Sequence, residues 1–333
     1  MKKIFSTLIE EDSDGIDHNI PNARYKRWKI NSLGFRGKEI DLEKKEGQIR
    51  IVCLGASETF GAFESKNWPS QLGEMLGDPF PRVEVVNASV VGLNLKKKKD
   101  YVEKYVLPLK PDIMIIFQGF MISGFNIYRK DSTRGVERKH WVTKGKEKNP
   151  IKVYLSHRRE LPIFGETIKG WLPKWVLTSL NLWMLRRKIR EKEKKYLINK
   201  KPVDEVPENN ILEFERDLKL LVHYLIEKNI VPVLSTYPAL MTPFNKDTHE
   251  YLLLANRRFM IELSEKGVVD APNRFNQAIK RISKELNLIL IDNYNLIPKT
   301  LEYFSDNFHY TDKGAEFIAK NFHDGLNHYK LIK

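Results

Sequence analysis

Residues 50–61 read Arg-Ile-Val-Cys-Leu-Gly-Ala-Ser-Glu-Thr-Phe-Gly and join an apolar run to a serine in a glycine-bounded turn. The run Arg50–Leu54 shows no clean alternation of polar and apolar residues, which is typical of a parallel strand covered on both faces. Ser57 follows the run directly, so we expect its hydroxyl at the carboxyl end of a strand, where parallel sheets place their sites. Taken alone, a Gly-x-Ser sequence more often forms a structural turn than it carries a catalytic serine.

Further apolar runs and helical patterns repeat along the chain. The runs are short and rich in Val and Ile, and they are Val83–Asn87, Asp112–Phe117, Ile230–Ser235 and Leu288–Ile291. Apolar residues at three- and four-residue spacing predict helices at Leu95–Val106, Ile211–Lys228 and Arg274–Leu286. A last helix is expected at Asp312–His328, with Thr311 as its cap. Strands that alternate with helices predict a parallel sheet with helices on both sides.

The composition is that of a globular chain with an excess of positive charge. Hydrophobic residues make up 41% of the 333 residues and the net charge is +14. This excess favours anionic partners such as phosphate groups, acidic glycans or an anionic membrane surface, although a solvated basic surface explains it equally well. No run approaches about 18 uninterrupted apolar residues, so we expect no membrane span, no signal peptide and a cytoplasmic location. The one cysteine, Cys53, is expected in the core.

A second candidate for chemistry lies near the end of the sequence, at Asp306-Asn307-Phe308-His309. A carboxylate three residues before a histidine on a tight turn can hold one ring nitrogen by a hydrogen bond. That bond fixes the tautomer of the imidazole and leaves its other nitrogen free to accept a proton from a serine. Asp and His at this spacing also occur by chance at helix caps, so the pattern gains weight only together with Ser57.

Glycine turns after the second and third predicted strands, Val91-Gly92 and Gln118-Gly119, complete a series of blocks. In their order and content these blocks resemble the SGNH hydrolases, a branch of the GDSL esterases. The resemblance runs from about Asn31 to His328, is loose over residues 125–209, and rests on Asn31 to Gly37, Gly55-Ala56-Ser57, Gly92, and Asp306 to His309 continued through Thr311 and Gly314. It implies a flavodoxin-like three-layer α/β/α sandwich around a five-stranded parallel sheet.

The resemblance also implies a role for each block. Ser57 would be the nucleophile, His309 its base, and Asp306 the residue that orients His309. The backbone N–H groups of Ser57 and Gly92 would bind the oxyanion. The implied activity is hydrolysis of carboxylic esters, such as O-acetylated carbohydrates or lipid esters, without a metal or an organic cofactor.

The third block departs from the family pattern. The family usually has Gly-x-Asn-Asp there, and its asparagine donates to the oxyanion, whereas this chain has Gly119-Phe120-Met121-Ile122. Methionine cannot donate a hydrogen bond, and the loss of one oxyanion donor typically costs about 10²–10³ in rate. A third donor is therefore sought near Gly119, and its candidates are Asn126, Asn94 and Gln118.

Two regions do not follow the alternation of strands and helices. Residues 1–48 form a polar, loop-like extension that we expect to pack on the hydrolase domain, residues 49–330. That domain carries an inserted helical segment at about 125–209, in which Trp171–Lys195 combines tryptophans with Arg and Lys. We interpret Trp171–Lys195 first as a helix packed on the sheet layer, with a lid over the ester site and an interfacial membrane helix as alternatives. The run Lys96–Lys99 follows Gly92 closely and is interpreted first as a solvated helix face, with a position near the mouth of the site as the alternative.

Other chemistries have less support. The remaining histidines lack metal-ligand spacing and are His18, His140, His157, His223, His249, His323 and His328. No P-loop and no dinucleotide fingerprint occurs, and nucleic-acid binding is not expected because only the net charge favours it. Two alternatives to hydrolysis stay open: an acyltransferase on the same scaffold, and a glycan- or lipid-binding module without catalysis, which Met121 favours.

Overall fold

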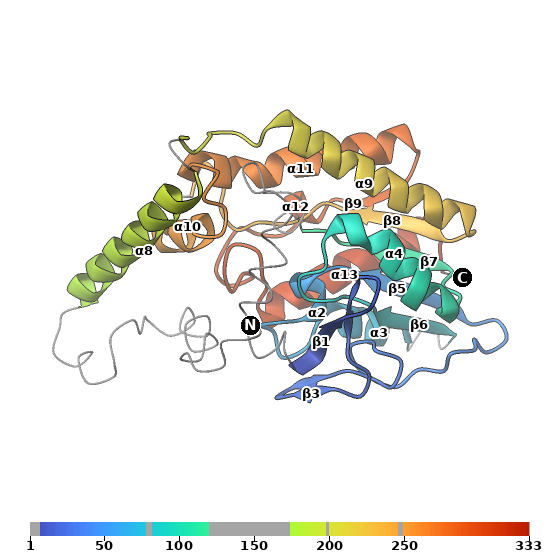
Figure 1. Ribbon diagram of the computed structural model, residues 1–333. Coiled ribbons are helices and arrows are strands. Elements are labelled where there is room, and N and C mark those ends of the chain that lie inside the picture. The colour runs from blue at the N-terminus through green and yellow to red at the C-terminus, as the bar shows by residue number, and fades with distance from the viewer. Residues whose placement is uncertain (1–6, 78–81, 120–173, 198–199, 246–248, 333) are drawn as a thin grey trace.

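The computed structural model describes residues 7–77, 82–119, 174–197, 200–245 and 249–332 (Figure 1). At its centre lies a five-stranded sheet in the order β6-β5-β7-β8-β9, and every neighbouring pair is parallel. The strands are β5 (Ile49–Leu54), β6 (Val83–Asn87), β7 (Ile113–Ile116), β8 (Val231–Ser235) and β9 (Ile289–Ile291). The five strands expected from the apolar runs are thus confirmed to within a residue at each end.

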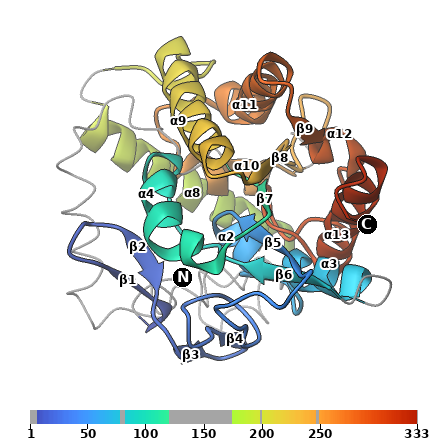
Figure 2. The ribbon, with the colours of Figure 1, turned by 90° about the vertical axis from the view of Figure 1, so that its right-hand side faces the viewer.

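Helices cover both faces of the sheet, which makes three layers (Figure 2). One face carries α3 (Trp68–Gly77) and α13 (Asp312–His328), which pack against each other. The other face carries α9 (Glu208–Glu227), α11 (Glu265–Glu285) and the segment after β6. The predicted α/β/α sandwich is therefore confirmed.

The observed helices agree with the expected ones at α13 and differ at α11 and in the segment after β6. Thr311 caps α13 as expected, because its hydroxyl accepts the N–H of Gly314 at 3.1 Å. Helix α11 begins earlier than its apolar pattern indicated, at Glu265, where Ser264 caps it and Pro272 lies inside it. The segment expected as one helix after β6 is instead a series of short turns: η1 (Leu95–Lys97), α4 (Lys98–Tyr101), the π-helical η2 (Val102–Val106) and η3 (Leu107–Leu109).

The N-terminal extension is more ordered than its polar composition suggested. It forms two small antiparallel pairs, β1 (Ile9–Glu11) with β2 (Asp17–Asn19) and β3 (Arg24–Tyr25) with β4 (Trp28–Lys29). Its apolar side chains, among them Leu8, Ile16, Trp28, Ile30 and Phe35, are buried in the same core cluster as the central sheet. The extension thus packs against the sheet domain by its apolar residues.

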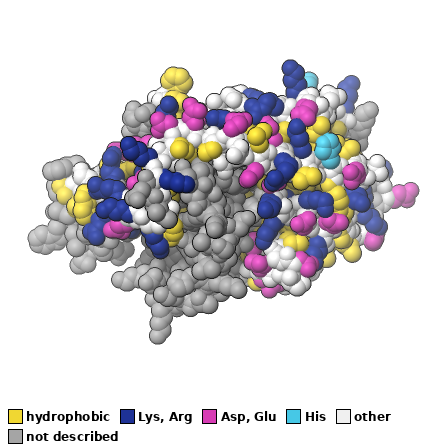
Figure 3. All heavy atoms as spheres, turned by 45° about the horizontal axis from the view of Figure 1, so that its top comes forward, with side chains coloured by type: hydrophobic (Ala, Val, Ile, Leu, Met, Phe, Trp, Pro, Cys, Tyr) yellow, Lys and Arg dark blue, Asp and Glu magenta, His cyan; other side chains and the backbone are white. Residues whose placement is uncertain are grey.

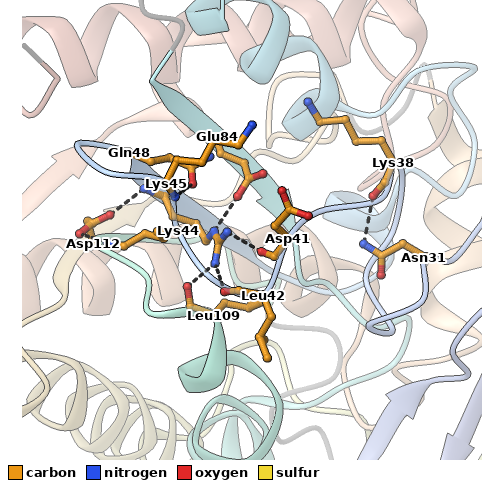
Figure 4. A network of polar contacts seen from close by, with 11 residues as sticks. Asn31, Lys38, Asp41, Leu42, Lys44, Lys45, Gln48, Glu84, Leu109 and Asp112 are labelled. Carbon is orange, nitrogen blue, oxygen red and sulfur yellow. Dashed lines mark hydrogen bonds and ion pairs between the residues drawn. The ribbon is translucent and has the colours of Figure 1, made fainter.

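A buried arginine joins the extension to the amino ends of the strands (Figure 4). Arg50 on β5 is fully buried, and its Nε donates to Glu84 Oε2 on β6 at 2.6 Å. Its other guanidinium nitrogens donate to the backbone carbonyls of Asp41, Leu42 and Leu109. Because a buried guanidinium must find acceptors for its donors, Arg50 fixes these loops to the edge of the sheet opposite Ser57.

Helix α8 (Lys174–Tyr196) does not lie on the sheet layer (Figure 1). Its buried side chains Leu185 and Ile189 pack on Leu254 of α10 (Glu250–Arg257), in a small cluster separate from the main core. The interpretation of Trp171–Lys195 as a helix on the sheet layer was therefore wrong. The physical reason is that its apolar stripe is narrow and its second half is almost entirely charged. Within the described residues, no helix has the length and apolar character needed to span a membrane.

Candidate active site

Ser57 begins the short helix α2 (Ser57–Phe60) at the carboxyl end of β5. The strand must end in glycine here, because a Cβ on Gly55 would lie 1.9 Å from Thr59 Oγ1 and 3.0 Å from the carbonyl oxygen of Phe117. Gly61 ends the helix in the left-handed region at φ 79°, which favours glycine. The glycine-bounded sequence therefore holds Ser57 on a tight turn, with its backbone N–H in the first turn of α2, where helical N–H groups have no acceptor inside the helix.

The structure brings Ser57, His309 and Asp306 into one chain of hydrogen bonds across 252 residues of sequence. Ser57 Oγ lies 2.9 Å from His309 Nε2. His309 Nδ1 lies 2.9 Å from Asp306 Oδ2 and 3.1 Å from Oδ1. Asp306 Oδ1 also accepts the backbone N–H groups of Phe308 and His309, at 2.8 and 2.9 Å. These two bonds fix the carboxylate within its own turn, so that it holds the imidazole in one orientation.

The electrostatics favour a protonated His309. Burial of the ring opposes its charged form, but the charge of Asp306 and its hydrogen bond outweigh burial, so the pKa of His309 is raised above its usual 6.5. The charges of Glu58 and Glu64 act in the same direction. An imidazole with this surrounding accepts a proton readily, which is what a general base requires.

Glu58, Glu64 and Lys98 are buried near this centre. Sequence reasoning missed both glutamates and named Lys98 only as part of the run Lys96–Lys99. Burial raises the pKa of Glu64 to about 7, and its Oε2 accepts the N–H of Phe63 at 3.0 Å. Burial also raises the pKa of Glu58, which folds back to accept the N–H of Ala56 at 2.8 Å. Glu58 directly follows Ser57, and this adjacency was the signal that the sequence offered.

Lys98 corrects the interpretation of Lys96–Lys99 as a solvated face. Its side chain is fully buried, and among the described residues its Nζ has no hydrogen-bond partner. Burial lowers the pKa of Lys98 to about 8, and the charge of Glu58 acts against that shift. Lys98 and Glu58 thus compensate each other electrostatically beside the nucleophile turn.

The loop after α2 covers one side of His309 and is held by the N-terminal extension. The rings of Phe63 and His309 lie 4.4 Å apart between centroids. Trp28 Nε1 donates to the carbonyl of Gly61 at 2.9 Å, and Arg27 donates to the carbonyl of Phe63. The extension therefore supports the loop that packs against the imidazole.

Gly92 lies on the turn after β6, the neighbour of β5 in the sheet, and has φ 90°. Asn87, at the end of β6, donates to the carbonyl of Thr59 at 2.8 Å and ties that turn to α2. The turn of Gly92 and the turn of Ser57 thus lie at the same edge of the sheet. The role of Gly92 as an oxyanion donor stays a prediction.

The third-block residues Met121 and Asn126 lie outside the described residues. Of the other candidates, Asn94 caps η1 by accepting the N–H of Lys97 at 3.0 Å. Gln118 is buried and donates to the carbonyl of Gly119. Both amides therefore have structural partners, and the third donor near Gly119 also stays a prediction.

Among the described residues, no group of three or more His, Cys, Asp or Glu is arranged to hold a metal ion. His140 and His157 lie outside those residues. Cys53 is buried in β5, and burial raises the pKa of its thiol well above the usual value. A thiol in that state is a poor nucleophile, so Ser57 has no competitor in Cys53.

No family model and no curated protein matches the chain. Among solved structures it is similar to an acetyl xylan esterase from Geobacillus stearothermophilus, with 14% identity over 84% of this chain and 94% of that one and a TM-score of 0.46. A second similar structure, a lipase/acylhydrolase from Enterococcus faecalis, has 14% identity over 86% of this chain and 98% of that one, with a TM-score of 0.46. A third, a GDSL-like lipase from Bacteroides thetaiotaomicron, has 10% identity over 86% of this chain and 91% of that one, with a TM-score of 0.42.

Proposed function

We propose that the protein is a serine esterase of the SGNH type that hydrolyses carboxylic esters. One observation carries the proposal: the continuous hydrogen-bond chain from Ser57 Oγ through His309 to Asp306, with both links at 2.9 Å. The same three groups in this geometry activate a serine on unrelated folds, because the chemistry depends on their arrangement and not on their sequence positions.

The reaction would proceed in two balanced steps. Ser57 Oγ attacks the ester carbonyl while His309 Nε2 takes its proton, and the N–H groups of Ser57 and Gly92 stabilise the oxyanion. Collapse of the tetrahedral intermediate expels the alcohol, which receives the proton from His309, and leaves an acyl-Ser57. Water then attacks the acyl group, gives its proton to His309, and releases the acid with return of the proton to Ser57.

The buried carboxylates support the proton transfer in this scheme. The imidazolium that forms during attack faces Asp306 directly and the charges of Glu58 and Glu64 at longer range. In a buried site such interactions are stronger than in water, and they lower the free energy of the charged intermediate.

Labelling with a fluorophosphonate probe tests the activated serine. The wild type should be labelled, and Ser57→Ala and His309→Ala should not. Ser32→Ala is the matched control, because Ser32 is exposed and its hydroxyl is hydrogen-bonded to Glu39 at 2.7 Å without a histidine. A folded wild type that stays unlabelled would refute the proposal and favour the binding module. Label that persists in Ser57→Ala would refute it by showing that another residue is the nucleophile.

The substrates we propose are small esters with a carbohydrate or lipid alcohol. A panel of p-nitrophenyl acetate, acetylated xylo-oligosaccharides and short-chain glycerides distinguishes these classes by kcat/KM. Product analysis with an added sugar acceptor distinguishes hydrolysis, which gives free acetate, from acyl transfer, which gives an acetylated sugar.

A further inference from the structure

Helix α8 holds a disproportionate share of the positive charge of the molecule. Its 23 residues include eight Lys or Arg and two Glu, a net charge of +6, whereas the whole chain has +14. In Figure 3, one group of dark-blue side chains lies at the left, where Figure 1 places α8, and others are spread over the rest of the visible face. A solvated helix needs no such excess of one sign.

Three of these cations share one face of the helix with an exposed tryptophan. Leu182, Leu185 and Ile189 face α10, so the residues on the opposite side of α8 point away from the body. That outer side carries Trp183 and Arg187, which are separated by one turn of helix, and continues through Arg190 and Lys194 at the same angular position. The side chain of Arg187 is 62% exposed, and Trp183 is 52% exposed although it is a large apolar residue.

Two cations of this face, Arg190 and Lys194, are available to a partner. Glu191 pairs with Arg187 at 2.8 Å, and the other acid of the helix, Glu193, pairs with Arg257 of α10. Within the described part of the chain, Arg190 and Lys194 form no ion pair. Two flanking lysines, Lys188 and Lys195, likewise form none there.

A hollow on the inner side of α8 does not compete for this role. It is lined by Arg186, Arg190 and Arg257, but Glu250 pairs with Arg186, Glu193 pairs with Arg257, and Glu265 lines the hollow as well. Two of the three guanidinium groups in the hollow are therefore paired, and Arg190, which lies between the hollow and the outer face, is left for a partner.

We propose that the outer face of α8, defined by Trp183, Arg187, Arg190 and Lys194, docks on an anionic lipid bilayer. The cations match the negative surface of such a bilayer, and arginine pairs well with lipid phosphates. The exposed tryptophan favours a bilayer over a purely polar polyanion, because an indole gains by entering the interface between headgroups and acyl chains. The helix lies on the surface and does not span it.

Co-sedimentation of the full chain with vesicles tests the proposal. Vesicles of phosphatidylcholine with 30 mol% phosphatidylglycerol should bind the protein in low salt, and vesicles of phosphatidylcholine alone should not. Because each basic residue near the surface contributes roughly fivefold to binding, the triple variant Arg187→Gln/Arg190→Gln/Lys194→Gln should bind about a hundredfold more weakly. Trp183→Ala should bind about tenfold more weakly.

The matched control is Lys26→Gln/Lys38→Gln/Lys45→Gln, which removes the same charge from exposed positions on the N-terminal extension. It should keep most of the affinity of the wild type, and far-UV circular dichroism should show that every variant is folded. Equal loss in both triple variants would mean that net charge alone drives binding, and would overturn the proposal. Retention on heparin without binding to anionic vesicles would overturn it as well, in favour of an acidic polysaccharide.

Discussion

Glu64→Gln should change the stability of the protein in a way that depends on pH. The carboxyl of Glu64 is buried, and burial raises its pKa from 4.5 to about 7. A group whose pKa is higher in the folded state binds its proton more tightly there, so its contribution to stability is full at pH 4 and is lost as the pH rises through 7. Glutamine has nearly the same shape, and its Oε1 can still accept the N–H of Phe63, but it does not ionise.

The magnitude follows from the shift. Raising the pKa of Glu64 to about 7 corresponds to ~3 kcal/mol between the two protonation states at 1.36 kcal/mol per unit. Nearly all of this difference accrues between pH 4 and pH 8. Relative to the wild type, Glu64→Gln should therefore gain about 3 kcal/mol in the free energy of unfolding over that range. For a chain of 333 residues, this gain is a shift of roughly 4 °C in Tm.

Urea unfolding of both proteins at pH 4, 6 and 8 measures this difference and cancels the titrating groups that do not interact with Glu64. Glu46→Gln is the matched control, because Glu46 is exposed and its variant should follow the wild type at each pH. A difference between Glu64→Gln and the wild type that is the same at pH 4 and pH 8 would show that Glu64 does not ionise near neutrality. Burial would then not raise the pKa of Glu64.

Three other substitutions test the remaining interactions. Asp306→Asn should lower kcat for ester hydrolysis by about 10⁴ and, because the pKa of His309 then falls, should move the acid limb of the pH–rate profile to lower pH. Lys98→Met should cost about 3–5 kcal/mol in urea unfolding because it leaves Glu58 buried without compensation, and adding Glu58→Gln should recover part of that loss. Arg50→Met should cost a similar amount, measured in the same way, while kcat of the folded protein stays unchanged.

The sheet was predictable because each of its strands appears in the sequence as a short run of mostly apolar residues. A strand buried on both faces must be apolar at nearly every position, and the run Ile113–Ile116 shows this without knowledge of its neighbours. The segment 95–106 was harder, because three- and four-residue apolar spacing is shared by α, 3₁₀ and π turns. Only packing against the sheet and α9 decides among them.

The centre of the site was predictable for a similar reason. Asp306 and His309 interact within one turn, so their spacing alone indicates their contact. Ser57 lies far away in sequence, but the rule that loops meet at the carboxyl edge of a parallel sheet brings it to the same place. Lys98 could not be distinguished from its neighbours, because in a run of four lysines only the tertiary fold decides which side chain faces inward.

The contribution of the N-terminal extension to the site could not be predicted from its local sequence pattern. Its polar composition indicated a loop-like extension packed on the domain, with no part in the site. In the structure, Trp28 and Arg27 hold the carbonyls of the loop whose Phe63 ring packs on His309. Nothing local to Trp28 marks it as part of the site, because its partners lie 33 residues further along the chain. An imidazole can serve as a base only while its ring is held in one position, and three sides of His309 are defined by Asp306, Ser57 and Phe63. The extension is therefore part of what positions the base, and the functional unit begins well before the first strand of the sheet.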